Sequence, residues 1–322
     1  MKTIAERLAS LHFWTTKFKA WVWIMIRSVL ICGISFVILY PIITKVSIAF
    51  KQESDIYDST VVWIPKHFTL ENFKLVFNAL DYSQVLLSTV LLSGGVMLLQ
   101  TFSCLLAGYG FSRIKFRGSG LLFACVIFTI LVPPQTIMIP TYLQYKDFDV
   151  LGIISLINGD SWNLINTYWP FLLSSALGMG LKTGLFVFIF RQFFRGIPRE
   201  MEEAAFVDGA GSFTTFIKII VPNAIPALVS VMLFSFVWQW NDSFFTSLIL
   251  TDPKVMSSMM ATAGPQILFY IGLQTGGGQA DPLYLSMIQN TGVLLAILPL
   301  IIMYLFVQRH FVESMERTGV VG

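Results

Sequence analysis

The chain alternates long apolar stretches with short segments that carry most of its charged residues. Six apolar stretches contain few or no Asp, Glu, Lys or Arg residues: 28–44, 82–112, 118–145, 161–190, 219–241 and 282–308. A helix needs about 20 apolar residues to cross a hydrocarbon core about 30 Å thick, and these stretches reach or approach that length. The pattern therefore predicts an all-α polytopic membrane protein with six transmembrane helices.

A seventh charge-free stretch, residues 255–280, is more polar than the other six. It contains Ser257, Ser258, Thr262 and three consecutive glycines at 276–278. Polar, glycine-rich segments beside a membrane are typical of re-entrant or interfacial loops rather than of spanning helices. We therefore expect the segment 255–281 to form an outer loop.

The distribution of positive charge orients the six helices. With both termini in the cytoplasm, most of the 21 Lys and Arg residues fall in the N-terminal segment and in inner segments around 113–117, 191–218 and 309–317. Cytoplasmic loops are enriched in Lys and Arg, and a seventh span would move Arg309 and Arg317 outside. We predict a cytoplasmic N-terminal segment (1–27), a six-span domain (28–308) that includes the inner loop 191–221, and a cytoplasmic tail (309–322).

Composition supports a membrane protein and excludes several other classes. Of the 322 residues, 55% are hydrophobic and 12% are charged, whereas soluble domains carry about 25% charged residues. The low charge also excludes intrinsic disorder. The net charge of +3 follows from the inner loops and requires no nucleic-acid partner. The cysteines lie in apolar stretches and the histidines on separate segments, so we expect no disulfide, metal site or catalytic set.

The inner loop 191–221 has the signals of a short helix. Pro198 suits the first turn, glutamates at 200, 202 and 203 complement the helix N-terminus, and Gly209 supplies a C-terminal stop. Ser212 can then cap a second helix that returns to the membrane at Pro222. The first helix could lie in the headgroup layer, but an anionic inner leaflet would repel its glutamates. The charge favours docking to a soluble protein and leaves a headgroup position open.

The spacing of this loop carries a family resemblance. The loop contains Glu203-Ala204-Ala205, then Gly209, and, after nine intervening residues, Ile219-Ile220-Val221-Pro222. It resembles the EAA loop of ABC-importer permeases, E-A-A-x3-G-x9-I-x-L-P, with Val221 in place of Leu. The likeness is strongest over residues 164–250. Other segments resemble the second permease subunit of maltose-type carbohydrate importers: Tyr168-Trp169-Pro170, Phe190-Arg191-Gln192-Phe193-Phe194, Ile197-Pro198, Trp240-Asn241-Asp242 and Phe68-Thr69-Leu70-Glu71-Asn72-Phe73.

The resemblance implies a mechanical role for the loop. In that family the loop forms a coupling helix that sits in a cleft of a separate ATP-hydrolysing subunit. Carried over to this chain, docking is assigned to Glu203, Ala204, Ala205, Asp208, Gly209 and Ala210. The family also implies a second homologous permease subunit, two ATP-binding subunits, an extracytoplasmic solute-binding protein that could meet the segment 255–281, and a sugar or oligosaccharide as solute. The expected location is the bacterial plasma membrane.

The chain offers no nucleotide-binding loop of its own. The nearest string, Gly178-Met179-Gly180-Leu181-Lys182-Thr183-Gly184, lacks the Gly that precedes Lys in a phosphate-binding loop. We therefore expect a transport subunit rather than an enzyme, with no cofactor in this chain and with ATP and Mg bound by the partner subunits.

Lys182 is a charged residue within the fourth apolar stretch. A lysine at the centre of a bilayer costs about 2.5 kcal/mol or more, so an intramembrane lysine indicates function by default. Lys182 lies about 13 residues from Trp169 at the outer end, which is roughly 20 Å along a helix. We expect its side chain to face a cavity or protein and to be a candidate for the solute path. An interhelical structural contact is the alternative.

A polar and aromatic cluster closes the fifth apolar stretch. It consists of Trp238, Gln239, Trp240, Asn241 and Asp242. Polar groups beside aromatic faces suit a sugar, so these residues are further candidates for the solute path, and an interfacial aromatic belt is the open alternative. Gln239 and Asn241 are two residues apart, so they point to different sides of a helix.

Two other functions stay open. Permeases for non-sugar solutes have the same coupling loop, and only the maltose-type segments favour carbohydrate. An ion-coupled secondary transporter would need ionisable residues within the membrane. Only Lys182 and, near a helix end, Asp242 are available for that role.

Overall fold

The structure is a computed structural model that describes residues 4–251, 255–275 and 281–319. Within these ranges, β pairing is limited to two isolated bridges, Lys51 with Phe68 and Phe148 with Trp162. The all-α prediction is confirmed for this part of the chain. The elements are α1 (Ile4–Ala49), α2 (Glu53–Ile56), α3 (Glu71–Ala79), α4 (Tyr82–Arg113), α5 (Ser119–Leu131), the 3₁₀ helix η1 (Pro134–Ile137), α6 (Met138–Lys146), α7 (Ile153–Asn158), α8 (Trp169–Ala176), α9 (Thr183–Gly196), α10 (Glu200–Val207), α11 (Ser212–Thr215), the π-helical segment η2 (Phe216–Ile220), α12 (Val221–Asn223), α13 (Ile225–Asn241), α14 (Phe244–Ile249), α15 (Met256–Thr275) and α16 (Pro282–Gly319).

The chain divides into two compact units, and the first contains the described residues up to Lys74 together with Asp281–Leu294. Side-chain hydrogen bonds join its parts. Lys45 Nζ donates to Asn290 Oδ1 at 2.7 Å. Asn72 Nδ2 donates to the carbonyl oxygens of Ala49 (2.9 Å) and Lys51 (2.8 Å). These bonds tie the end of α1 to the start of α3 and to the first turns of α16.

The loop between α2 and α3 is organised by a buried carboxylate. Asp55 accepts a hydrogen bond from the backbone N–H of His67 at 2.9 Å, and its Oδ1 lies 2.7 Å from His67 Nδ1. The backbone bond from His67 outweighs the effect of burial and lowers the pKa of Asp55. The loop is therefore held by an ionised aspartate at neutral pH.

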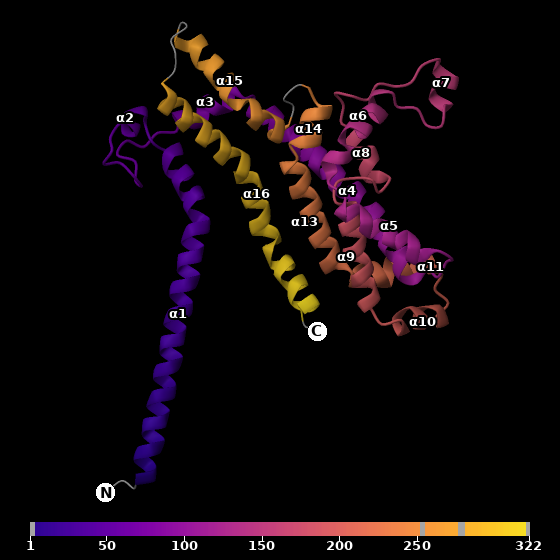
Figure 1. The fold of residues 1–322 in the computed structure, drawn as a ribbon, viewed down its shortest axis with the longest axis horizontal. Helices are drawn as coiled ribbons and strands as arrows, with labels where there is room; N and C mark the ends of the chain where they lie inside the picture. The colour runs from indigo at the N-terminus through magenta and orange to yellow at the C-terminus, as the bar shows by residue number, and fades with distance from the viewer. Residues whose placement is uncertain (1–3, 252–254, 276–280, 320–322) are drawn as a thin grey trace. The chain divides into compact units, whose positions relative to one another are not determined.

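The second unit, which contains Leu75–Ala280 and the chain from Leu295 onward, is built around α4. Helices α8, α9 and α13 lie along α4, and α5 lies beside α9 (Figure 1). Cys104 of α4, Phe186 and Phe190 of α9 and Val231 of α13 form its core. Gly108 lets α4 approach α9 closely, since a Cβ at this position would lie 2.5 Å from Cβ of Phe190. A displacement of α4 would therefore also displace α9 and α13, because the three helices are tightly packed.

The described helices supply between three and five candidate spans. Three helical segments are long and apolar enough to cross a membrane as they stand: Lys17–Ala49, Tyr82–Arg113 and Pro282–Gln308. Two bent pairs meet the same criterion together: Ser119–Leu131 with Pro134–Lys146, bent by 101°, and Ser212–Asn223 with Ile225–Asn241, bent by 75°. The count of six and the cytoplasmic position of both termini stay predictions.

The fourth predicted span is a broken helix. The stretch 161–190 contains α8 and α9, which are separated by residues 177–182. Gly178 (φ 70°) and Lys182 (φ 61°) both adopt the left-handed conformation, which an α-helix does not continue through. Lys182 consequently lies at a helix start and not in a helix interior.

The expectation of a loop at 255–281 is corrected by the structure. Residues Met256–Thr275 form the helix α15, while the three glycines lie outside the described residues. Met259, Ala263, Ile267 and Ile271 are buried, and their spacing of four residues places them on one face of the helix. The serines and threonines that suggested a loop occupy the same helix, where hydroxyls bond to backbone carbonyls one turn back, as Thr262 does to Ser258.

Candidate functional site

The short helix predicted in the inner loop is present as α10. Gly209 follows it with φ 81°, its N–H donates to Phe206 O at 3.1 Å, and the N–H of Ala210 donates to Ala205 O at 2.9 Å. These two bonds form a Schellman motif, which needs a left-handed residue after the helix. A Cβ on Gly209 would meet nothing within 4 Å, so the backbone conformation rather than space requires glycine. The predicted stop at Gly209 is confirmed.

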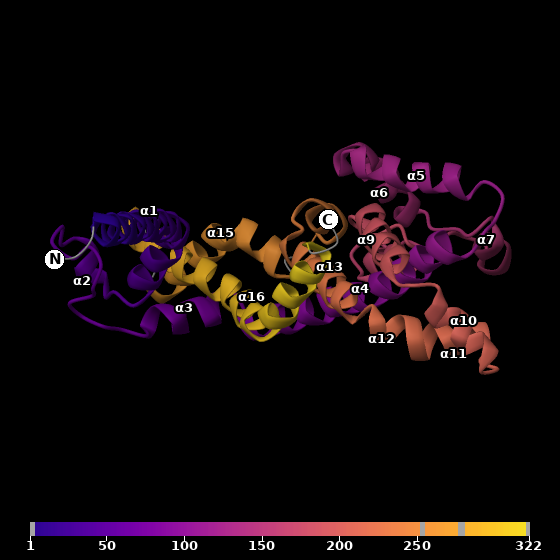
Figure 2. The ribbon, with the colours of Figure 1, turned by 90° about the horizontal axis from the view of Figure 1, so that it is seen from below.

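The six residues assigned to docking lie on and just after α10, but they are not all exposed. Glu203, Ala204, Asp208 and Gly209 are exposed and Ala210 is partly exposed, whereas Ala205 is buried within this chain. Helix α10 packs against α11 and η2, and α11 lies beside it in both views (Figures 1 and 2). The small Ala205 side chain thus lets α10 lie close to the segment that follows it.

Large apolar side chains surround the exposed docking residues. Phe206 (46% exposed), Val207 (87%) and Phe213 (75%) all face away from the rest of this chain. Exposed apolar side chains of this size, grouped in one place, mark a site of interaction with a protein or a membrane. The neighbouring carboxylates Glu203 and Asp208 favour a protein partner.

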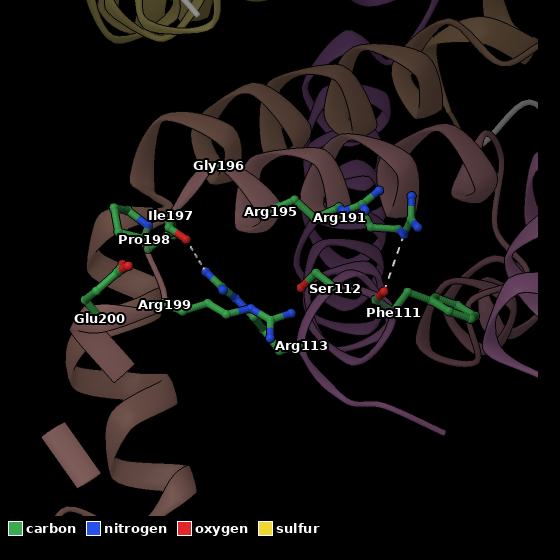
Figure 3. A pocket seen from close by; sticks show the side chains of 10 residues that line it. All are labelled: Phe111, Ser112, Arg113, Arg191, Arg195, Gly196, Ile197, Pro198, Arg199 and Glu200. Carbon is green, nitrogen blue, oxygen red and sulfur yellow. Dashed lines mark hydrogen bonds between the residues drawn. The ribbon is translucent and has the colours of Figure 1, made fainter. Parts of the chain in front are cut away.

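The end of α4 reaches the same loop. Arg113, its last residue, places Nε 3.1 Å from Glu202 Oε1 of α10 and donates from Nη2 to the carbonyl oxygen of Ile197 at 2.6 Å. A cavity of about 410 Å³ lies here, with Arg113, Arg191, Arg195 and Arg199 among its lining residues (Figure 3). Sequence reasoning counted Arg113 only among the inner cations and assigned it no contact with the loop. The available signal was that it is the first charge after a long charge-free stretch.

Lys182 occupies the break in the fourth span. Its side chain is exposed in this chain, and Nζ lies 5.9 Å from the centroid of the Trp238 ring, within the range of a cation–π contact. Among the described residues, no carboxylate forms an ion pair with it. A left-handed backbone is uncommon for a residue with a side chain, so Lys182 is held there by its surroundings.

Gln100 is the surrounding residue that sequence reasoning missed. It lies in α4 with 1% exposure, and its Nε2 donates to Leu181 O at 2.5 Å and to Thr183 Oγ1 at 3.1 Å. Ser235 of α13 donates to Gln100 Oε1 at 2.6 Å. Gln100 therefore bonds the break before α9 to both α4 and α13. The available signal was a glutamine in the middle of a long apolar stretch.

The cluster at the end of α13 separates into different roles. Gln239 is 5% exposed, and within the described residues its Nε2 has no hydrogen-bond partner, whereas Asn241 is exposed and donates back to Val237 O. The expectation that these two side chains point to different sides is confirmed. Asp242 accepts bonds from the backbone N–H groups of Phe245 and Thr246, so it caps the start of α14. Trp240 is 3% exposed and packs within the unit.

The site combines features of the inner loop with a break in the fourth predicted span. In the parts of the chain that the structure describes, no group of three or more His, Cys, Asp or Glu side chains is placed to hold a metal ion. What is present is an exposed, capped helix, an ion pair behind it, and a polar break in a membrane-length apolar stretch.

Comparisons with known proteins agree with this arrangement. A family described as binding-protein-dependent transport system inner membrane component matches residues 101–317. The chain is 28% identical over 286 residues to the probable ABC transporter permease protein YurM of Bacillus subtilis, which covers 88% of this chain and 84% of YurM. It is 27% identical over 292 residues to the maltodextrin transport system permease protein MdxG of the same organism, covering 90% of this chain and 93% of MdxG.

The fold is similar to a chain of known structure. With a TM-score of 0.71 and 19% identity, it matches a chain from the crystal structure of a bacterial ABC transporter involved in the import of the acidic polysaccharide alginate. The match covers 97% of this chain and 99% of the other.

Proposed function

We propose that this chain, which belongs to the family of binding-protein-dependent transport system inner membrane components, is the permease subunit of an ATP-driven ABC importer for a sugar or oligosaccharide. It works in the bacterial plasma membrane with six spans and both termini inside. Its partners are a second homologous permease subunit, two ATP-binding subunits and an extracytoplasmic solute-binding protein.

The observation that carries the proposal is the exposed helix α10 with its capped end. Glu203, Ala204, Asp208, Gly209 and Ala210 present backbone and acidic groups next to the apolar side chains of the same loop. We propose that this surface docks in a cleft of the ATP-binding subunit, with Ala205 packed beneath it. ATP hydrolysis in the partner then moves α10, and α10 moves the membrane helices.

A sugar is supported by the relatives and by the polar groups near the helix break. MdxG is named for maltodextrin, a neutral oligosaccharide, and the structural neighbour belongs to a transporter that imports an acidic polysaccharide. Two candidates for the solute path have polar side chains without a local partner among the described residues. Gln239 Nε2 has no hydrogen-bond partner, and Lys182 makes a cation–π contact but no ion pair. Asn241 and Asp242 use their side chains on neighbouring backbone, and we keep them and Trp240 as secondary candidates.

The experiment is reconstitution of the full complex in vesicles. We expect uptake of a labelled oligosaccharide, with maltotriose and trigalacturonate as the neutral and acidic probes, only when ATP is on the side of the ATP-binding subunits and the solute-binding protein is on the other side. Calorimetry of the binding protein with the same two probes identifies the class of solute. Uptake that needs neither ATP nor the binding protein would contradict the proposal.

The two alternatives give different results in the same vesicles. A permease for a non-sugar solute would show ATP hydrolysis stimulated by its binding protein but would transport neither oligosaccharide. An ion-coupled transporter would respond to an imposed ion gradient and be abolished by an ionophore. The second alternative is less favoured, because Lys182 precedes α9 whereas Asp242 lies between α13 and α14 and already caps α14.

A further inference from the structure

The strongest unassigned feature lies behind the docking helix. Arg113 belongs to α4, yet its guanidinium contacts two parts of the inner loop. Nη2 donates to the carbonyl of Ile197 at 2.6 Å (Figure 3), and Nε lies 3.1 Å from the carboxylate of Glu202 in α10. The side chains are only 6% and 12% exposed for Arg113 and Glu202. Because this ion pair is so well shielded from water, removing one member leaves the other charge buried and uncompensated.

The other arginines around the cavity do not make this connection. Arg191 donates from Nε to Phe111 O at 3.4 Å and lies over the ring of Phe123 at 3.7 Å. Arg195 and Arg199 are exposed, and the structure gives neither an ion pair among the described residues. Arg113 is thus the cavity arginine that bridges from a membrane-length helix to α10.

The position of Arg113 gives this bridge a mechanical consequence. Helix α10 is joined to its neighbours along the chain by the short non-helical segments 197–199 and 208–211. Arg113 instead connects it directly to α4, along which α8, α9 and α13 pack. A displacement of α10 would therefore reach the centre of the unit without passing through either connecting segment.

We infer that Arg113 is a positioning residue that fixes α10 to α4, so that movement imposed on α10 by the ATP-binding subunit is passed directly into the membrane helices. This inference rests on the proposed function and extends it by naming the route. A simpler role exists for any arginine at a helix end, namely to complement the negative end of the helix dipole. The two roles differ in whether Glu202 is needed as the partner.

The first test exchanges the two charges in the full reconstituted complex. We expect Arg113→Glu and Glu202→Arg each to reduce the ATP hydrolysis stimulated by the solute-binding protein at least about tenfold, a factor that corresponds to 1.4 kcal/mol. The double variant Arg113→Glu/Glu202→Arg should recover a large part of it. Recovery is incomplete because a glutamate at position 113 cannot donate to Ile197 O.

Matched controls carry the same charge changes at the same cavity. Arg195→Glu and Arg199→Glu alter exposed side chains, and we expect both to stay within about twofold of the unsubstituted complex, as surface charges contribute little. Co-purification of the ATP-binding subunits shows whether each variant still assembles. Equal loss in these controls, or a double variant no better than the single ones, would overturn the inference.

The second test measures movement and needs no solute. Spin labels are placed on Phe102→Cys of α4 and Met201→Cys of α10 in a chain whose three cysteines are replaced by serine. We expect the distance between the labels to be the same in the nucleotide-free complex and after trapping with ATP, Mg and vanadate. In Arg113→Gln the distance should change on trapping by more than the width of its distribution.

The outcomes separate the inference from the function on which it rests. If the unsubstituted complex shows no ATP hydrolysis that the solute-binding protein stimulates, the proposed function fails, and this is seen before any variant is made. If the complex is active but the label distance changes on trapping with Arg113 intact, only the route through Arg113 is overturned.

Discussion

Gly209 and Lys182 both adopt the left-handed conformation at a helix end, and they do so for different reasons. Gly209 ends α10 with φ 81°, and Lys182 starts α9 with φ 61°. At Gly209 the chain has the residue that reaches this conformation without strain. At Lys182 it has a long cationic side chain in a conformation for which glycine would be easier.

The surroundings of the two residues show why a side chain is present at position 182 although the backbone there favours glycine. Next to Gly209, hydrogen bonds within the helix end are sufficient, and nothing within 4 Å would contact a Cβ. Next to Lys182, Gln100 of α4 holds Leu181 O and Thr183 Oγ1 from a second helix. Residues with a strained backbone cluster at functional sites. We therefore propose that position 209 needs glycine for its backbone conformation, whereas position 182 needs lysine for its ammonium group.

The largest effect is expected at Gly209. In Gly209→Val a β-branched residue must adopt a left-handed backbone, which costs roughly 1–2 kcal/mol and displaces the exposed end of α10. We expect ATP hydrolysis stimulated by the solute-binding protein to be lost while the chain still inserts in the membrane. Gly209→Asp, which adds a charge to the same surface, should behave alike.

Gly211 provides the matched control. It lies two residues further in the same loop, has φ −73° and ψ 162°, and has open space around its Cα. Any residue adopts this extended conformation, so Gly211→Val should retain most of the stimulated hydrolysis. A normal Gly209→Val complex would show that the capped helix end is not needed for coupling.

Lys182 should have the next largest effect, and two substitutions separate its backbone from its charge. Lys182→Gly relieves the backbone strain but removes the ammonium group, whereas Lys182→Arg keeps a positive charge. If the charge is the reason for the lysine, Lys182→Gly and Lys182→Met lose about tenfold in transport of the solute, equivalent to 1.4 kcal/mol, and Lys182→Arg loses less. The measurement is the concentration dependence and sugar range of uptake in vesicles.

A different order of transport among the Lys182 variants would indicate a structural role for this residue. If Lys182→Gly transports normally and is more stable to heat than the unsubstituted chain, the left-handed backbone matters and the ammonium group does not. Lys182→Met with unchanged affinity and unchanged sugar range would likewise remove the residue from the solute path.

A structural feature can be predicted from this sequence when the residues that determine it are close together in the chain. Both ends of α10 were predictable, because the glutamates at its start and the glycine after its end act within a few residues. The break at residues 177–182 was not, because it depends on Gln100, which is far away in sequence and reaches it only through packing of α4 on α9. The helix α15 was missed for a related reason, since its serines and threonines look polar in sequence while its buried face lies on every fourth residue.

Substitution of Gln100 tests whether the break at residues 177–182 is stabilised by its hydrogen bonds to α4. In Gln100→Leu the carbonyl of Leu181 loses its donor in a buried place, which costs about 1–3 kcal/mol. We expect a fall of several degrees in the melting temperature of the purified chain and a smaller loss of transport than in Lys182→Gly. Gln84→Leu, at an exposed position of the same helix, is the control. No change in melting temperature would mean that the break is stable without Gln100.

The smallest effect, and the finest test of the same comparison, is expected for Ser235→Ala. This change removes the hydroxyl that donates to Gln100 Oε1, but it leaves the bonds from Gln100 Nε2 to the break intact. A hydrogen bond of this kind contributes about 1 kcal/mol, so the melting temperature should fall by less than in Gln100→Leu and transport should be nearly normal. Ser230→Ala removes a hydroxyl that donates within α13, to Pro226 O, and serves as the control. If Ser235→Ala were as damaging as Gln100→Leu, the support for Lys182 would come from α13 rather than from α4.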